Sequence, residues 1–333
     1  MRIIALEEHY AVEALMKRID PDLIVKRGYP HPDAPSARPQ IEANLIDLGP
    51  NRIADMDKHG ITMQVLSTSG PGSDLLAPAE GVAWAREVND ILADEIKKRP
   101  DRYAGFAHLP LSDPEAAAKE LDRCINKLGF KATMVNGTTD GKFFDDPRFE
   151  PILAQCEALD IPLYIHPGIP PAAVREAYYS NLPGPMPTIL SRAGYGWHTE
   201  AAIHILRLAL SGVLDRHPKL KVVIGHQGEG LPAALTRFDE QFGPLTPKFL
   251  QRSVTQMMHD QLHITTAGFY SVPTFNMLMQ TFGIDKLMFS VDYPYSQHAW
   301  ARDFLDKIEL SPADREKFAH GNAEKLLKLK PAA

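Results

Sequence analysis

The segment KVVIG, at residues 221–225, is a short and nearly unbroken apolar run, and a second run, KLMFSV, occupies residues 286–291. Strands of a parallel sheet that is buried on both faces show this pattern, because neither face needs polar side chains. Six further β-rich runs are spaced along the chain and alternate with helical patterns. The predicted strands are Arg2–Leu6, Ile61–Thr68, Tyr103–Leu109, Ala132–Asn136, Pro162–His166, Lys221–Gly225, His263–Ala267 and Lys286–Val291.

Helix start signals lie between these runs. Asp113, Asp146 and Ser311 each precede a proline, which is typical of an N-cap residue followed by the first residue of a helix. Alternating strands and helices predict a parallel α/β fold, and eight units in 333 residues favour a closed (β/α)8 TIM barrel over an open sheet. Without a repeat or a linker in the sequence, we expect one domain over residues 1–333.

Two long segments interrupt the alternation. Residues 11–50 follow the first strand and contain YPHPDAPSARP, whose prolines predict a loop. Residues 168–198 follow the fifth strand and are rich in proline, glycine and aromatic residues. Both are expected as insertions at the carboxyl-terminal face of the barrel, where long insertions build or cover an active site.

The composition argues against several classes of function. The formal net charge is −6 and no stretch is rich in lysine and arginine, so a nucleic-acid partner is not expected. No apolar stretch approaches the ~20 residues that cross a bilayer, and the first ten residues do not resemble a signal peptide. Cys124 and Cys156 both fall in predicted helices, so we expect reduced thiols in a cytoplasmic protein.

The first predicted strand leads into three polar residues, Glu7-Glu8-His9. Residues two apart on a strand point to the same side. Glu7 and His9 are therefore expected to face one point inside the barrel, while Glu8 faces away.

Further polar residues follow other predicted strands. His166 ends the fifth strand, His226 and Glu229 follow the sixth, and Asp292 follows the eighth. Each residue alone also fits a structural role, since a single histidine after a strand more often makes hydrogen bonds than binds a metal. Their coincidence at the carboxyl ends of four strands, where barrel enzymes carry catalytic residues, favours a metal site.

The other histidines carry a weaker signal. His59 is expected at a helix C-terminus, and His217 in a surface turn. His108 ends the third strand, where it fits either the lining of a pocket or a structural role. His198 ends the second long segment, from which it could reach a substrate.

Six short stretches together resemble the decarboxylase branch of the amidohydrolase superfamily, over residues 3 to about 328. They are ALEEH at 5–9, IHP at 165–167, IGHQGEGLP at 224–232, HITTAG at 263–268, FSVDYP at 289–294 and GNAEKLLKL at 321–329. This branch includes 2-amino-3-carboxymuconate semialdehyde decarboxylase. Glu-x-His in the first strand resembles the γ-resorcylate, 2,3-dihydroxybenzoate and 5-carboxyvanillate decarboxylases, because most of the superfamily has His-x-His there.

The resemblance implies roles for individual residues. His226 and Glu229 would form a pair beside the substrate, and Arg237, in ALTRFD, would contact the substrate. The sequence after His166 departs from the HPRNP pattern of γ-resorcylate decarboxylases, so the motifs do not fix the substrate. The implied ligands of a divalent metal, Zn²⁺ or Mn²⁺, are Glu7, His9, His166 and Asp292.

The implied function is metal-dependent, non-oxidative decarboxylation of an aromatic acid with an ortho-hydroxyl group, carried out by a homodimer or homotetramer. Asp292, protonated, would deliver a proton to the ring carbon, and the charge of Glu7 is expected to raise the pKa of Asp292. The same ligands would serve a hydrolase of a lactone, amide or ester, with Asp292 as general base. A third alternative is an inactive barrel that serves as a binding or assembly subunit.

Overall fold

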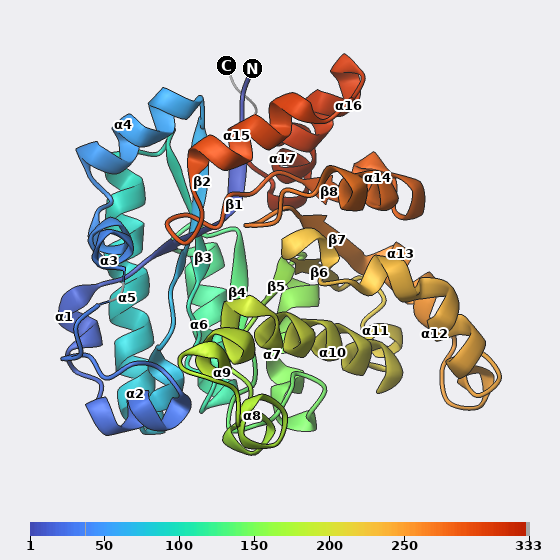
Figure 1. Ribbon diagram of the computed structural model, residues 1–333, viewed down its shortest axis with the longest axis horizontal. Coiled ribbons are helices and arrows are strands. Elements are labelled where there is room, and N and C mark those ends of the chain that lie inside the picture. Colours follow the sequence, from blue (N-terminus) through green and yellow to red (C-terminus); the bar gives the residue numbers. More distant parts are fainter. Residues whose placement is uncertain (37, 331–333) are drawn as a thin grey trace.

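Eight parallel strands form the centre of the computed structural model, which describes residues 1–36 and 38–330. Each strand pairs with the next one along the chain, in the order β1 to β8 (Figure 1). The strands are β1 (Ile4–Tyr10), β2 (Met63–Thr68), β3 (Tyr103–Ala107), β4 (Ala132–Asn136), β5 (Pro162–His166), β6 (Lys221–Ile224), β7 (Leu262–Thr265) and β8 (Leu287–Met288).

The two ends of the sheet meet between β1 and the residues that follow β8. Glu8 forms a parallel bridge with Tyr293, and His9 N donates to Tyr293 O at 2.6 Å. Asp292 N donates to Glu7 O at 2.9 Å. The predicted (β/α)8 barrel is therefore confirmed, and its closing seam runs beside Glu7, His9 and Asp292.

Helices surround the barrel and connect its strands (Figure 1). They are α1 (Glu13–Met16), α2 (Pro21–Arg27), α3 (Pro39–Ile46), α4 (Pro50–His59), α5 (Pro78–Lys98), α6 (Pro114–Asn126), α7 (Glu150–Ala158), α8 (Ala172–Tyr179), α9 (Met186–Ile189), α10 (Gly196–Leu210), α11 (Val213–Arg216), α12 (Leu235–Phe242), α13 (Val254–Gln261), α14 (Val272–Thr281), α15 (His298–Lys307), α16 (Pro312–Glu316) and α17 (Asn322–Leu327). Asp113 and Ser311 cap α6 and α16 as predicted, because their side chains accept backbone N–H groups of the first turn.

Two apolar layers hold this arrangement together. Inward side chains such as Leu6, Phe106 and Met288 fill the barrel, while Leu66, Leu163 and others pack outward against the helices. All seven residues of β1 are buried, including its glutamates and its histidine. The polar side chains of β1 thus lie where water does not compensate their charge, which is costly unless partners are supplied.

Several predicted boundaries differ from the structure. The first strand is Ile4–Tyr10 rather than Arg2–Leu6, so Glu7 and His9 lie inside the strand and not beyond its end. Within residues 11–50, the stretch YPHPDAPSARP forms the predicted loop over its described residues 29–36 and 38, and Pro39 begins α3. The rest of the segment contains α1 and α2 before this loop, and Pro21 begins α2 because proline also fits the first turn of a helix.

The two long segments contact each other. Arg27 Nη1, in α2, donates to Ile169 O at 2.5 Å, and Arg175 Nη1, in α8, donates to Arg27 O at 2.7 Å. Residues 168–198 contain α8, α9 and the first turn of α10.

Across the described ranges, no helix is both long and apolar enough to cross a membrane.

Candidate metal centre

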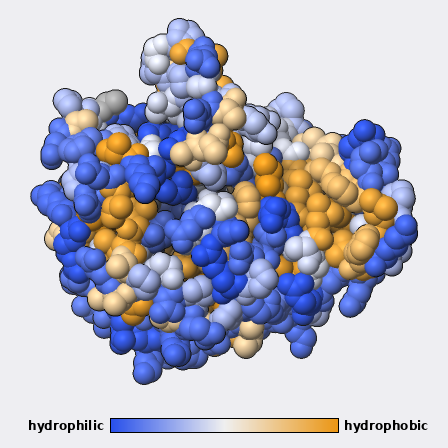
Figure 2. Space-filling model, turned by 90° about the horizontal axis from the view of Figure 1, so that it is seen from below, coloured by the Kyte–Doolittle hydropathy of each residue, from blue (hydrophilic) through white to orange (hydrophobic). Residues whose placement is uncertain are grey.

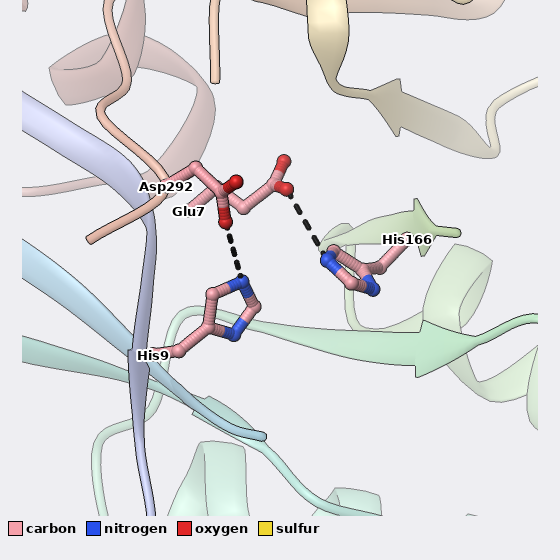
Figure 3. Close-up of side chains that lie close together, drawn as sticks. All are labelled: Glu7, His9, His166 and Asp292. Atoms are coloured by element: carbon pink, nitrogen blue, oxygen red, sulfur yellow. Dashed lines mark ion pairs between the residues drawn. The ribbon is translucent and has the colours of Figure 1, made fainter. Parts of the chain in front are cut away.

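Four side chains from three parts of the barrel converge at its carboxyl-terminal end (Figure 3). Glu7 and His9 come from β1, His166 from the end of β5, and Asp292 from the segment after β8. His9 Nε2 lies 3.2 Å from Asp292 Oδ1, and His166 Nε2 lies 3.3 Å from Glu7 Oε1. We call these four residues the mouth cluster; one ligand atom from each lies within 4.8 Å of the others.

Local backbone conformation places these groups. Glu7 and His9 point to the same side of β1 (Figure 3), and a register shift between Ala5 and Glu8 turns Glu7 to the side that Leu6 also faces. Asp292 has a φ of 69°, a left-handed conformation that is uncommon for a residue with a side chain and is often found at functional sites. Gly225 is required beside them, because a Cβ there would collide with Glu7 Oε2.

Partners on the far side orient two of the proposed ligands. Ser67 Oγ lies 3.2 Å from His9 Nδ1, which leaves His9 Nε2 directed toward Asp292. Tyr164 donates to Glu7 Oε2, and its hydroxyl also lies 2.7 Å from Thr265 Oγ1. Outer partners of this kind hold metal ligands in the orientation that binding needs.

Burial and mutual charge shift the pKa values of the cluster. Burial raises the pKa of Glu7 to about 7, although His226 and His9 act against the shift. Burial and the neighbouring His9 place the pKa of His166 well below its usual value. Burial acts to raise the pKa of Asp292, but the adjacent His226 and His9 imidazoles outweigh it and lower the pKa overall.

This result corrects the expectation that Asp292 holds a proton because of Glu7. The two imidazoles near Asp292 stabilise its anion more than burial destabilises it. Of the two carboxyl groups in the mouth cluster, Glu7 is the one with a raised pKa. Any proton that Asp292 delivers must therefore come from a neighbouring group.

The hydrogen-bonding state of the mouth cluster fits a bound cation. Glu7 Oε1 and His9 Nε2 are buried and make no hydrogen bond of good geometry; their polar neighbours are two other members of the cluster, His166 Nε2 at 3.3 Å and Asp292 Oδ1 at 3.2 Å. Buried polar atoms in folded proteins are nearly always paired, so these two call for a partner that the protein chain itself does not supply. Two imidazoles and two carboxylates are donors that suit Zn²⁺ or Mn²⁺.

His226 and Glu229 lie beside the mouth cluster. His226 Nε2 is 3.7 Å from Glu7 Oε1 and 3.9 Å from Asp292 Oδ2, while its Nδ1 is 2.8 Å from Glu229 Oε1. Burial lowers the pKa of His226, but the carboxylates of Glu229 and Glu7 outweigh it, so the pKa lies well above its usual value. His226, Gln227 and Glu229 all have φ between 50° and 54°, so this short turn is a strained backbone that fixes the pair.

Two contacts of this pair, one with His198 and one with Phe269, were not predicted from the sequence. His198 Nδ1 lies 2.8 Å from Glu229 Oε2, and the ring of Phe269 packs edge-on against both His198 and His226. Tyr164 was also missed, although its position two residues before His166 on β5 is a signal for the same face of the strand. No comparable pattern in the sequence points to Phe269.

The remaining histidines follow structural roles. His59 is the last residue of α4, as predicted. His108 lies 2.9 Å from Ser73 Oγ, and burial lowers the pKa of His108 to about 4. His217 lies in the predicted surface turn, between the exposed Arg216 and Pro218, but its side chain is buried and its Nε2 lies 2.7 Å from Glu150 Oε1 of α7.

Arg237 is not brought to the site. Its side chain is 67% exposed on α12 and pairs with Glu240 at 3.4 Å, on the same helix. Figure 1 shows α12 on the outer side of the molecule, away from the centre of the barrel. Within one chain, this geometry does not support contact between Arg237 and a substrate at the mouth cluster.

Comparison with known proteins places these features in a family. A γ-resorcylate decarboxylase of Rhodococcus jostii is 36% identical, over 98% of this chain and 98% of that protein. The γ-resorcylate decarboxylase of Polaromonas sp. is 34% identical with the same coverage of both chains. These relatives span the whole barrel, including both long segments.

Solved structures show the same likeness. A dihydroxybenzoic acid decarboxylase of Polaromonas sp. JS666, with bound manganese and the inhibitor 2-nitroresorcinol, is 33% identical with a TM-score of 0.87, over 99% of this chain and 98% of that chain. The 5-carboxyvanillate decarboxylase of Sphingomonas paucimobilis is 28% identical with a TM-score of 0.90, over 99% of both chains. The profile of the amidohydrolase family matches residues 31–329, and this chain belongs to that family.

Proposed function

We propose that this protein is a carboxy-lyase that removes carbon dioxide, without oxidation, from a hydroxylated aromatic acid. The observation that carries the proposal is the pair of unpaired buried atoms, Glu7 Oε1 and His9 Nε2, in a barrel whose relatives include decarboxylases with bound manganese. We propose Glu7, His9, His166 and Asp292 as the ligands of Mn²⁺ or Zn²⁺. When bound, the metal supplies Lewis-acid chemistry and a template for the substrate's oxygen atoms.

The residues of the chain supply the proton. His226 is the acid with the raised pKa, and its Nε2 lies 3.9 Å from Asp292 Oδ2. A shift of about 1 Å brings the two atoms to hydrogen-bond distance. We propose that His226 passes its proton to Asp292, and that Asp292 delivers it to the ring carbon that carries the carboxylate.

The atoms and electrons of this reaction balance without a further reactant. A C–H bond forms at the ring carbon, and the ring loses aromaticity. The C–C bond to the carboxylate then breaks, its electron pair returns to the ring, and carbon dioxide leaves. His226 then takes up a proton from solvent, which replaces the proton given to the ring before the next substrate acid binds.

A hydrolase would use the same ligands but needs an ionised base beside activated water. The lowered pKa of Asp292 is compatible with either chemistry, so the choice rests on the relatives, which are decarboxylases over nearly their full length. An inactive barrel would not need buried metal-ligand atoms without a hydrogen bond, and the mouth cluster has two of them, Glu7 Oε1 and His9 Nε2.

The test is a panel of hydroxybenzoates and lactones incubated in D2O with the Mn- and Zn-loaded protein. We expect an ortho-hydroxybenzoate to release carbon dioxide and to gain one deuterium at the vacated ring carbon. Hydrolysis of lactones together with no release of carbon dioxide across the panel would sink the proposal.

We also propose a homodimer or homotetramer in the cytoplasm. Figure 2 shows separate apolar areas on one face of the molecule, and exposed apolar side chains include Ile203 and Leu210 of α10 and Phe249. Cys124 and Cys156 are buried free thiols, in keeping with a reducing compartment. Light scattering of the purified protein tests the assembly, since a monomer at all concentrations would contradict it.

A further inference from the structure

Glu229 lies between two histidines that come from different parts of the chain. Its Oε1 is 2.8 Å from His226 Nδ1, and its Oε2 is 2.8 Å from His198 Nδ1. The carboxylate is fully buried; within the described residues neither of its oxygens nor either imidazole Nδ1 meets full hydrogen-bond geometry, so both contacts are close polar contacts. A buried carboxylate is costly without partners, so the two imidazoles together determine where it sits.

The tautomer of His198 follows from its other neighbour. Trp197 Nε1 donates to His198 Nε2 at 3.2 Å, and an indole N–H can only donate. His198 Nε2 is therefore the acceptor, and the ring proton is on Nδ1, where it faces Glu229. Ala193 O approaches His198 Nε2 at the longer distance of 3.3 Å, so we assign the tautomer from the Trp197 contact.

The packing around the pair is aromatic. The His198 and His226 rings have centroids 4.6 Å apart, and Phe269 lies 4.9 Å from the first and 5.4 Å from the second. His198 is 6% exposed and cannot turn to solvent without disturbing this packing. The rings of His226 and Phe269 thus keep His198 against Glu229.

We infer that His198 is a positioning residue for turnover: it holds Glu229 so that Glu229 fixes His226 with Nε2 toward the mouth cluster. The inference rests on the proposed function. It gives the segment 168–198 a part in proton transfer as well as in covering the barrel, because His198 and Trp197 reach the site from its end. Without His198, Glu229 Oε2 is buried without a partner and the carboxylate turns away from His226.

The first experiment compares His198→Ala, His198→Asn and the control Thr199→Ala, whose residue neighbours His198 on the same helical turn. For His198→Ala we expect kcat to fall about 10–100-fold, the usual loss for an outer partner, with an unchanged KM and metal content. His198→Asn can still donate to Glu229 and should recover much of kcat, and Thr199→Ala should match the wild type. An unchanged kcat in His198→Ala, or a loss explained by metal content or by unfolding, would overturn the inference.

A second measurement does not depend on the reaction. In ¹⁵N-histidine-labelled protein, the ring signals of His226, assigned from His226→Asn, should show a proton on Nδ1. These signals should change in His198→Ala and stay unchanged in Thr199→Ala. If no substrate turns over but the His226 signals respond in this way, the proposed function fails and the positioning role stands; unresponsive signals contradict the positioning role.

Discussion

Two of the groups of histidine and carboxylate side chains in this protein lie on opposite sides of β1, and they differ in how their polar atoms are satisfied. The mouth cluster faces the inside of the barrel end. The other group, Asp55, His59 and His298, lies between α4 and α15, and we call it the flank cluster. In both, ligand atoms come within 4.8 Å of one another, so distance alone does not separate a metal site from a structural network.

The flank cluster is paired internally. Gln64 Nε2 lies 2.8 Å from His298 Nε2, and His298 Nδ1 lies 2.7 Å from Asp55 Oδ2. Because an amide NH2 only donates, His298 Nε2 accepts and His298 Nδ1 donates to Asp55. His59 Nδ1 lies 2.9 Å from Asp55 O. Among the described residues, no buried side-chain atom of this cluster lacks a hydrogen-bond partner, in contrast to Glu7 Oε1 and His9 Nε2.

The adjacent residues Glu7 and Glu8 divide between these two environments. Glu8 accepts from Val291 N at 2.8 Å and from Gln64 Nε2 at 3.2 Å, on the side of the flank cluster. Glu7 keeps one oxygen unpaired on the side of the mouth cluster. The comparison teaches that residue types alone do not mark a cation site, because the two clusters share them and differ in their unsatisfied buried atoms.

The largest expected effect comes from comparing separate substitutions of these two neighbours, Glu7 and Glu8. Glu7→Gln removes a charged oxygen that makes no hydrogen bond within the described residues, so metal content and decarboxylation should fall by more than ~100-fold, beyond the loss of an outer partner. Glu8→Gln keeps an oxygen for Val291 N, so most of the metal should remain. Elemental analysis and carbon dioxide release measure both; equal losses in the two variants would remove the distinction between the two sides of β1.

His226→Asn should lose turnover while it retains most of the metal. His226 lies 3.7 Å or more from the mouth cluster carboxylates, and general acid catalysis typically contributes 10²–10⁴-fold, so kcat should fall by about that factor. Glu229→Gln should show a milder loss of about 10–100-fold. If His226→Asn emptied the metal site, His226 would have to be counted as a ligand.

Removal of the metal should destabilise the wild type, because the mouth cluster loses its bound ion; the flank cluster should make no contribution to this change. A ligand that binds only the folded state adds about 2.7 kcal/mol at a concentration of 100 Kd. Thermal unfolding of chelator-treated protein should therefore shift upward when Mn²⁺ is added back. The same shift in Asp55→Asn, and its absence in Glu7→Gln, would assign the metal to the mouth cluster; the reverse result would assign it to the flank cluster.

A smaller effect is expected in the flank cluster itself. The hydrogen bond from His298 lowers the pKa of Asp55, so Asp55 stabilises the fold above its unfolded pKa of about 4 and loses this contribution as pH falls through its folded pKa. Asp55→Asn should cost about 1 kcal/mol at pH 7, since the group is partly exposed. Urea unfolding should show the gap closing below pH 4; a gap that persists there contradicts the ionic contribution.

The sequence predicted the barrel and the direction of Glu7, Glu8 and His9 because strand alternation and the strand–helix rhythm are local patterns. It did not predict that Glu8 is buried, since Gln64 of β2 comes from 56 residues away. The lowered pKa of Asp292 depends in the same way on His226, which follows another strand. Distances between strands decide such properties, and no single stretch of sequence contains them.

Arg237→Ala gives the smallest expected effect and tests a role that only the family resemblance implied. The side chain is 67% exposed and its pairing with Glu240, three residues along α12, is of a kind that contributes little to stability. We expect the free energy of unfolding to change by less than about 0.5 kcal/mol, and KM and kcat to stay near the wild-type values. A tenfold rise in KM, with metal content and stability unchanged, would show that Arg237 meets the substrate after all. Because one chain keeps this guanidinium away from the mouth cluster, that outcome would require a second chain to complete the site, and the rise in KM would then depend on the assembly state measured by light scattering.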